Sequence, residues 1–116
     1  DHVRPTPRTV VVFCTRSHDH DADALAALMG AEVEADARCA FIGLVGSRTK
    51  AVHIGRRFAD DPVAAARFAQ VSVPVGLDIG AETPHEIAVS ILAEILATTR
   101  ERGKVKGRLM DRGSGA

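Results

Sequence analysis

Three short apolar runs stand out along the chain, and longer segments with helical spacing of apolar residues separate them. TVVVFC, residues 9–14, is almost wholly apolar and β-branched, and CAFIGLV, residues 39–45, has the same character. Uninterrupted apolar runs of this length predict strands that are buried on both faces, as in a parallel sheet. The third run, VSVPVG at residues 71–76, contains Pro74 and predicts an edge strand, because proline cannot donate to a central ladder.

The segments between the runs carry helix signals. Residues 21–30, DADALAALMG, have acids at the start and Gly30 as a stop, and a polar connection then leads to the second strand. A helix is expected from GSRTK to about Asp60, and a shorter one after Asp61 as N-cap with Pro62 in the first position. Strand, helix and strand in this order predict a βαβ unit and an α/β domain.

The last helix has the clearest signals. Thr83 and Glu86 form a capping box around Pro84, and an apolar stripe follows at helical spacing. The stripe consists of Ile87, Ile91, Leu92 and Ile95, and Gly103 can end the helix. We expect residues 1–8 to be a leader or linker remnant, residues 9–103 to form the domain and residues 104–116 to be a flexible tail.

The composition of the chain mainly excludes classes of partner and location. The 116 residues are 46% apolar and carry 15 basic and 15 acidic side chains, so the formal net charge is zero. A neutral chain gives no reason to expect nucleic acid or a membrane surface as partner. No run reaches the roughly 20 apolar residues of a membrane span, and the start lacks a secretory signal, so we expect a cytoplasmic protein. Cys14 and Cys39 lack paired spacing and are expected to be reduced thiols.

Polar segments follow all three predicted strands: TRSHDHD, GSRTK and GLDIGAET. Because ligands bind outside the carboxyl ends of the strands in open parallel sheets, we expect these segments to line one crevice. Gly46 allows close backbone approach, and Ser47 and Arg48 supply a hydroxyl and a guanidinium near a helix N-terminus, which favours a phosphate or another anion. A surface ion pair is an equally good interpretation of Arg48, and a tight turn explains GLDIG as well as ligand contact does.

Metal binding and catalysis receive weaker support. His18 and His20 could share a transition metal with neighbouring acids or Cys14, but no second ligand cluster has recognisable spacing, and the acids also suit a helix start. Cys14 is expected to be a small core residue rather than a nucleophile. The glycine fingerprint of dehydrogenases, the P-loop and the G-x-S-x-G elbow of hydrolases are all absent. The sequence therefore predicts a ligand crevice without a metal site or a catalytic residue.

Three stretches taken together resemble a known family. TRSHDHDADAL, FIGLVGSRTK and above all VPVGLDIGAETPHEIAVSILAEI closely resemble the Rossmann-type C-terminal domain of the xanthine dehydrogenase accessory protein family (XdhC/CoxI), from about Val10 to Thr99. The resemblance implies a Rossmann-like parallel sheet in a three-layer αβα arrangement, and we expect the first βαβ unit of that family to be missing here. The positions that match the family's motifs are Thr15, His18, Asp19, His20, Gly43, Gly46, Ser47, Arg48, Gly76, Asp78, Gly80, Thr83, Pro84 and Glu86.

The resemblance also implies a function. Members of the family assist molybdenum hydroxylases such as xanthine or carbon monoxide dehydrogenase: they bind the molybdenum cofactor, promote its sulfuration and deliver it to the apoenzyme. A non-enzymatic maturation factor is therefore expected, with the apoenzyme and a sulfurtransferase as partners, and with a homodimer whose second subunit completes the crevice. The expected cofactor-binding residues are Thr15, Arg16, His18, Asp19, His20, Gly46, Ser47, Arg48, Gly76, Asp78 and Gly80.

Two other functions fit parts of the pattern. The βαβ order favours a nucleotide-binding Rossmann module, or an oxidoreductase that uses NAD(P) or FAD, although the missing glycine fingerprint argues against both. The capped last helix could instead present a docking surface to a partner, although its apolar stripe suits a core position better.

Overall fold

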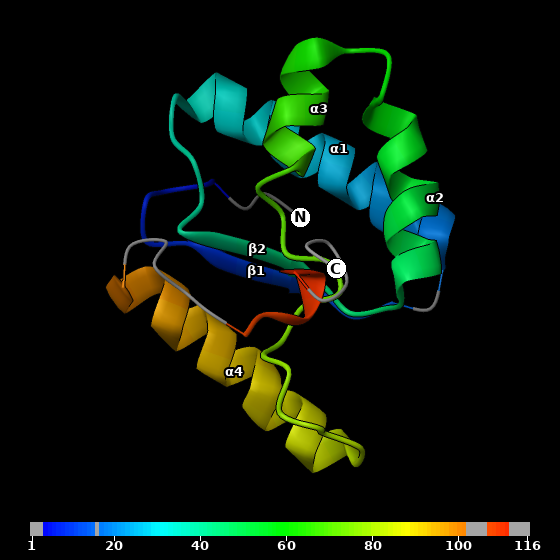
Figure 1. Cartoon of the computed structure of the whole chain (residues 1–116). Helices are drawn as coiled ribbons and strands as arrows, with labels where there is room; N and C mark the ends of the chain where they lie inside the picture. Colours follow the sequence, from blue (N-terminus) through cyan, green and yellow to red (C-terminus); the bar gives the residue numbers. More distant parts are fainter. Residues whose placement is uncertain (1–3, 16, 102–106, 112–116) are drawn as a thin grey trace.

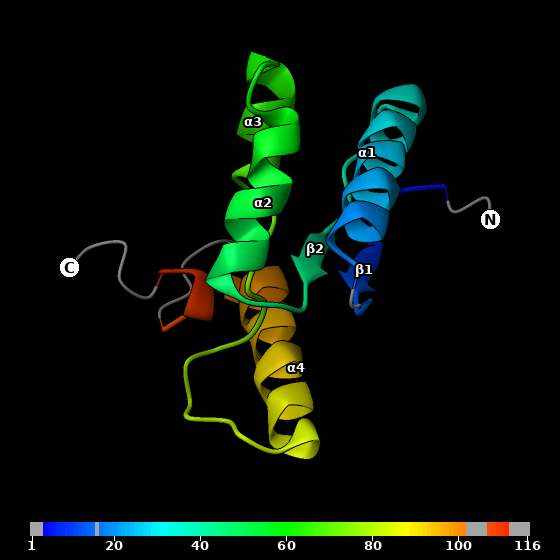
Figure 2. The same ribbon diagram turned by 90° about the vertical axis from the view of Figure 1, so that its right-hand side faces the viewer.

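The computed structural model describes residues 4–15, 17–101 and 107–111, and its elements follow the predicted order of strands and helices. In chain order they are β1 (Val10–Phe13), α1 (His18–Ala35), β2 (Phe41–Leu44), α2 (Arg48–Phe58), α3 (Pro62–Phe68), α4 (Pro84–Glu101) and the 3-10 helix η1 (Leu109–Asp111). Helices α1, α2 and α3 lie on one side of the sheet, and α4 lies on the other (Figures 1 and 2). The predicted three-layer αβα arrangement is confirmed.

Strands β1 and β2 pair in parallel along their whole length. The third apolar run lies along the other edge of β2, where Ser72 N donates to Ile42 O (2.9 Å) and Leu44 N donates to Ser72 O (2.9 Å). This run forms an isolated parallel bridge, and the sheet within the described residues has two strands instead of the predicted three. Pro74, which has no N–H to donate, limits the pairing at this edge.

The two strands differ in burial. β2 has a neighbour on each side, and its side chains at Phe41, Ile42 and Leu44 are all buried. Among the described residues β1 lies at an edge of the sheet: Val11, Val12 and Phe13 are partly buried, and Val10 is 41% exposed. The prediction that both runs are buried on both faces is therefore right for β2 and wrong for β1.

Helix α1 is longer than its pattern predicts. It begins after Ser17, whose hydroxyl accepts a hydrogen bond from His20 N (3.2 Å), and it continues through Gly30. Asp36, in the left-handed region with a φ of 52°, ends it. A glycine inside a helix costs about 1 kcal/mol relative to alanine, and the burial of the apolar face of α1 outweighs this. The expected stop at Gly30 is wrong for that reason.

Helix α4 starts as predicted, because Glu86 N donates to Thr83 Oγ1 (3.1 Å) and Thr83 N donates to Glu86 Oε1 (3.1 Å). Its buried face differs from the predicted apolar stripe. Leu92 is 59% exposed, whereas Ser90 and Glu94 are buried. The carboxyl group of Glu94 takes an inward position because it accepts hydrogen bonds from the third apolar run.

Residues 107–111 belong to the segment that was expected to be a flexible tail, and here they contact the end of the third run. Leu109 N donates to Gly76 O (2.8 Å). Lys104 and Gly103, where the tail and the helix end were expected, lie outside the described residues. Across the described ranges, no helix is both long and apolar enough to cross a membrane.

Candidate functional site

The polar segments that follow the strands meet at one end of the sheet (Figure 1). Val45 N donates to Phe13 O (2.9 Å), which keeps the end of β2 beside the end of β1. Gly46 from the second segment and residues 77–81 from the third line one cavity of about 300 Å³. The second and third segments therefore line one cavity, as predicted, whereas no described residue of the first segment lines it.

A buried lysine joins the first two segments. Lys50, on the first turn of α2, is 3% exposed, and its Nζ donates to Thr15 O (3.1 Å) and Val45 O (2.5 Å). The same ammonium group forms an ion pair with the fully buried carboxylate of Asp21 on α1. Thr15 Oγ1 donates to the other oxygen of this carboxylate, Asp21 Oδ1 (2.6 Å). We call Lys50, Asp21 and Thr15 the strand-end clamp, because together they hold the ends of β1 and β2 in place.

Two exposed pairs align α1 with α2 outside the clamp. His53 Nε2 lies 3.4 Å from Asp19 Oδ1, and Arg57 pairs with Asp23. Exposed pairs of this kind contribute about 0–1 kcal/mol each, so they orient the helices more than they stabilise them. The acids of DHDAD therefore face the basic side of α2, and Asp19, an expected cofactor contact, is engaged with α2.

Gly46 and Ser47 have structural roles that the sequence did not indicate. Ser47 is the N-cap of α2, and its hydroxyl accepts a hydrogen bond from Lys50 N (3.2 Å). A side chain at Gly46 would overlap Cδ of Lys50, so the glycine makes room for the lysine stem. Both residues are needed to bring Lys50 into the clamp, whether or not a ligand also contacts them.

Arg48 is an exposed cation at this end of the sheet. Its Nη2 donates to Leu109 O at 3.4 Å. No carboxylate among residues 4–15, 17–101 and 107–111 pairs with it, so the interpretation as a surface ion pair has no support there. Helix α2 begins at Arg48, α1 begins at the same end of the sheet (Figure 1), and the first backbone N–H groups of a helix attract anions.

The third segment makes a tight turn. Gly76 has a φ of 126° and Gly80 a φ of 73°, both in the range that favours glycine. Gly76 N donates to Glu94 Oε1, and Asp78 N donates to Gly107 O, each at 2.6 Å. The chain therefore bends at GLDIG, and the backbone N–H groups of residues 76–79 all donate within the chain.

The structure describes only some of the other expected site residues. Arg16 and the side chain of His18 lie outside the described residues, and His20 is exposed on the first turn of α1. Cys14 is also exposed, so the expectation of a core position is wrong: it lies beyond β1, where the chain leaves the sheet. In the described part of the chain, no three His, Cys, Asp or Glu side chains come together in a group that could hold a metal ion.

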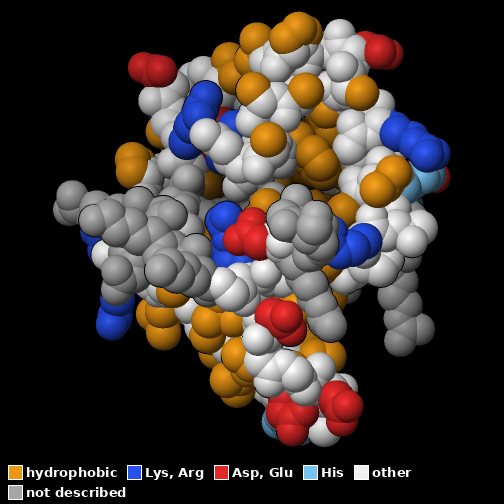
Figure 3. Space-filling model, in the orientation of Figure 1, with side chains coloured by type: hydrophobic (Ala, Val, Ile, Leu, Met, Phe, Trp, Pro, Cys, Tyr) orange, Lys and Arg blue, Asp and Glu red, His pale blue; other side chains and the backbone are white. Residues whose placement is uncertain are grey.

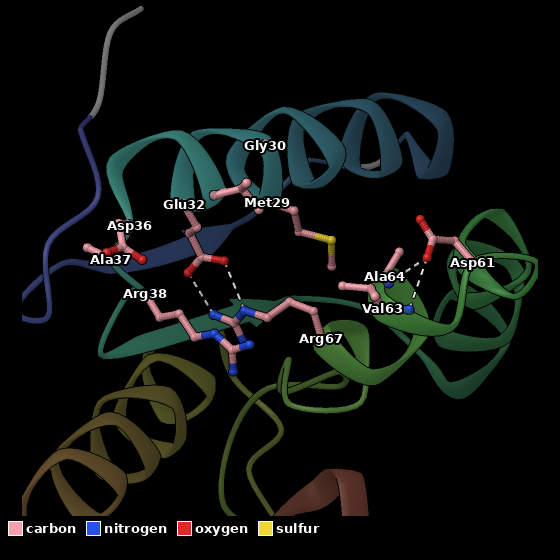
Figure 4. Close-up of a pocket in the computed structure, with 11 residues that line it drawn as sticks. Met29, Gly30, Glu32, Asp36, Ala37, Arg38, Asp61, Val63, Ala64 and Arg67 are labelled. Carbon is pink, nitrogen blue, oxygen red and sulfur yellow. Dashed lines mark hydrogen bonds and ion pairs between the residues drawn. The ribbon is translucent and has the colours of Figure 1, made fainter.

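A larger cavity, of about 490 Å³, lies at the opposite end of β2, between α1 and α3 (Figure 4). Arg67 Nε donates to Glu32 Oε1 (2.9 Å), and Arg67 Nη2 donates to Glu32 Oε2 (2.7 Å). Arg67 Nη1 donates to Gln70 Oε1 (3.2 Å), and Cys39 N donates to Glu32 Oε2 (2.8 Å). Because these buried polar groups already have partners, we interpret the cluster as a tie between α1 and α3 rather than a ligand site.

The same cluster shifts two pKa values. Burial raises the pKa of Glu32, but the hydrogen bonds from Arg67 and Cys39 N lower it more, and the result lies below the ordinary value of 4.5. Burial and the neighbouring Glu32 carboxylate raise the pKa of the Cys39 thiol. Cys39 is therefore protonated at neutral pH, as an unreactive structural thiol should be.

Sequence reasoning missed Lys50, Glu32 and Glu94. Each is a charged residue at a position where the helical pattern calls for an apolar one: Lys50 precedes the buried Ile54 by one turn, and Glu32 follows the buried Leu28 by one turn. A charged residue in register with an apolar stripe is the signal that could have found them.

Comparison with known proteins shows which family the chain resembles. Residues 1–95 match the family described as the XdhC Rossmann domain. The uncharacterized protein YqeB of Escherichia coli (strain K12) is 49% identical over 57 residues, which are 49% of this chain and 10% of that protein. A probable xanthine dehydrogenase subunit from Bacillus subtilis (strain 168) is 35% identical over 96 residues, which are 81% of this chain and 24% of that protein. The chain thus spans between about a tenth and a quarter of the length of these relatives.

Proposed function

The chain belongs to the XdhC Rossmann family, and from this premise we propose that it is an accessory factor for a molybdenum hydroxylase. In this function the crevice at the carboxyl ends of β1 and β2 binds the molybdenum cofactor and presents it for sulfuration and insertion into the apoenzyme. The relative that is named as a probable xanthine dehydrogenase subunit supports a client of this class. The protein acts as a carrier of the cofactor and catalyses no reaction on it.

One observation carries this proposal: α1 and α2 both begin at the end of the sheet where Arg48 lies exposed. The N-terminus of a helix presents unpaired N–H groups and the positive end of the helix dipole, which together attract phosphate. A guanidinium adds charge-assisted hydrogen bonds that match phosphate oxygens. The molybdenum cofactor is a pterin that bears a phosphate, so this end of the sheet suits the phosphate group.

The adjoining cavity suits the ring system of the cofactor. Its walls combine the apolar side chains of Val75, Ile79 and Ile87 with the backbone of Gly46 and Gly80. A flat heterocycle gains contact with apolar walls, while a few polar groups fix its orientation. A cavity of about 300 Å³ is small for a complete cofactor, which leaves part of the cargo exposed for transfer.

Equilibrium binding of isolated molybdenum cofactor tests the proposal. We expect Arg48→Ala to weaken binding about tenfold or more, because a hydrogen bond to a charged group contributes about 1.5–3 kcal/mol. Arg38→Ala removes the same charge near the opposite end of β2 and is the matched control, which should bind like the wild type. Equal affinity of the wild type and Arg48→Ala would contradict the assignment of the site.

Two finer parts of the proposal need their own measurements. His18→Ala in the same titration tests the expected contact of His18 with the cofactor. The apoenzyme and a sulfurtransferase are the partners that the function requires, and reactivation of cofactor-free hydroxylase by the loaded chain measures delivery. Arg48→Ala should deliver less cofactor in proportion to its weaker binding.

A nucleotide is the competing ligand, because α1 follows β1 in a parallel βαβ unit and a nucleotide would also place a phosphate at the helix start. The segment between β1 and α1 lacks the glycine fingerprint that lets a pyrophosphate approach the backbone. Thermal-shift measurements with NAD, NADP, FAD, AMP and CTP separate the two ligands. A clear shift with one nucleotide, together with no binding of molybdenum cofactor, would favour the nucleotide-binding module.

A further inference from the structure

The crevice already contacts a segment of its own chain. Residues 107–111, which we call the closing segment, lie beside the end of the third apolar run (Figures 1 and 2). Leu109 N donates to Gly76 O (2.8 Å), and Asp78 N donates to Gly107 O (2.6 Å). This antiparallel pairing is the way in which an extended peptide adds to an exposed backbone edge.

Side chains of the closing segment reinforce the backbone contacts. Leu109 lines the same cavity of about 300 Å³ as Gly46 and Asp78. Its Cδ1 would lie 3.3 Å from a Cβ added at Gly76, so it packs closely over that glycine. Arg108 and Asp111 form two hydrogen bonds, of 2.9 and 3.2 Å, which hold the turn of η1 in shape.

The closing segment uses groups that the proposed function gives to the cofactor. Arg48 Nη2 donates to Leu109 O (3.4 Å), and Asp78 N donates to the segment as well. A cofactor that takes both groups, and that fills the cavity beside Leu109, has to displace the segment. The segment and the cofactor therefore compete for one site.

The closing segment also stands apart from the family match. The XdhC Rossmann domain covers residues 1–95, and residues 107–111 lie beyond it. The family match therefore does not include the segment.

We propose that residues 107–111 are an internal competitor that closes the cofactor crevice until the cargo displaces it. This inference rests on the proposed function, because it concerns the regulation of the same site. The apparent affinity for a ligand is reduced by the fraction of the protein that is open, so a segment closed about 90% of the time weakens binding about tenfold. Return of the segment would also favour release of the cofactor to the apoenzyme.

The test compares the wild-type chain with Leu109→Ser and with the control Val63→Ser. Val63 is an exposed valine of α3 that does not line the cavity, so the control also replaces an apolar side chain by serine, but away from the crevice. Amide hydrogen exchange at Asp78 reports whether the segment is docked and needs no ligand. We expect Leu109→Ser to exchange faster at Asp78 and to bind isolated molybdenum cofactor about tenfold more tightly, while Val63→Ser changes neither.

The outcomes separate this inference from the proposed function. Unchanged amide exchange at Asp78 in Leu109→Ser, or faster exchange without tighter binding of the cofactor, would overturn the proposal of an internal competitor. The proposed function would survive either result if the wild type and Leu109→Ser both still bind the cofactor. Faster exchange at Asp78 in Leu109→Ser, together with no cofactor binding by the wild type or the variants, would overturn the proposed function. The proposed competition between the segment and the cofactor would then fall as well. Arg108→Ala, which breaks the pair with Asp111, is a second opening variant and should act in the same direction as Leu109→Ser.

Discussion

Lys50 is a charged residue at a position where an α-helix normally buries an apolar side chain. It precedes Ile54 and Phe58 by one and two turns, and both of these are in the core. A buried ammonium is unfavourable unless its hydrogen-bonding capacity is used, and here Thr15 O, Val45 O and the Asp21 carboxylate use it. We interpret the clamp as a device that fixes the two strand ends at the crevice.

We expect Lys50→Met to lower the free energy of unfolding by about 3–5 kcal/mol, because it leaves the buried carboxylate of Asp21 without its cation. Urea denaturation measures the change. The double variant Lys50→Met/Asp21→Leu should recover most of the loss, since a packed apolar pair can replace a buried ion pair. A single variant as stable as the wild type would show that the pair does not form in solution.

The residue contacts that could be predicted from the sequence are the local ones. The N-caps at Asp61 and Thr83 depend on groups within four positions along the chain, and both are confirmed. The clamp could not be predicted, because Lys50 meets Asp21 only after two helices pack side by side. Gly46 was expected to allow the close approach of a ligand, and its contact with the Lys50 side chain depends on the same packing of the folded chain.

At the scale of elements, the tie between α1 and α3 is the clearest electrostatic feature. Glu32 of α1 is 5% exposed and accepts two hydrogen bonds from Arg67 of α3 and one from Cys39 N. These contacts hold the end of α1 beside the start of β2. The tie lies at the opposite end of β2 from the crevice, so it supports the fold and leaves the site unaffected.

This tie makes stability depend on pH. The pKa of Glu32 is lower in the folded chain than its ordinary value of 4.5, which applies to the unfolded chain. The contribution of Glu32 to the free energy of unfolding is therefore complete above pH 4.5, and it is lost as the pH falls through the lower pKa of the folded chain. Hydrogen bonds from Glu82 N and Thr83 N lower the pKa of the exposed Glu86, which adds a smaller effect of the same sign.

We therefore expect Glu32→Gln to reduce the loss of stability on acidification below pH 4.5, measured by urea denaturation at a series of pH values. Glu34→Gln, on the exposed side of the same helix, is the matched control and should keep the wild-type pH dependence. If the free energy of unfolding falls equally steeply below pH 4.5 in both variants, Glu32 is not the source of the acid destabilisation.

Element types were predictable where the pattern was long or flanked by caps. The apolar runs predicted β1 and β2, and Asp61 and the capping box predicted the starts of α3 and α4. The length of α1 was not predictable, because packing of its apolar face overrides the glycine signal at Gly30. The third run forms only a bridge to β2, because Pro74 has no N–H with which to continue the pairing.

At the scale of the whole molecule, two surfaces remain uncovered. β1 leaves one edge of the sheet unpaired among the described residues, and apolar side chains gather over α4 (Figure 3). On that helix Val89 is 57%, Leu92 59% and Leu96 49% exposed. A free strand edge and an apolar helix face both favour association with another chain. The homodimer expected from the sequence remains a prediction that these surfaces make reasonable.

Sedimentation velocity at a series of protein concentrations tests the homodimer. We expect a monomer–dimer equilibrium, and we expect Leu92→Glu/Leu96→Glu to shift it towards the monomer, because the charges would be buried at the interface. Glu34→Lys, an exposed change on the other side of the sheet, should leave the equilibrium unchanged. A monomer at every concentration of the wild-type chain would contradict the expectation.

The position of the crevice was predictable at this scale because parallel strands bring their carboxyl ends to one edge. The contact of residues 107–111 with the crevice was not predictable, because that segment shows no periodicity and its backbone hydrogen bonds go to residues about 30 positions earlier in the sequence.

The central claim is that the molybdenum cofactor binds at the carboxyl ends of β1 and β2. An amide NMR titration of the full chain with isolated molybdenum cofactor tests it most directly. We predict saturable shifts at the amides of Gly46, Arg48 and Asp78, with no change at Glu32 and Arg67 at the other end of β2. Shifts confined to the surroundings of Glu32 and Arg67, or no shifts at any concentration, would contradict the claim.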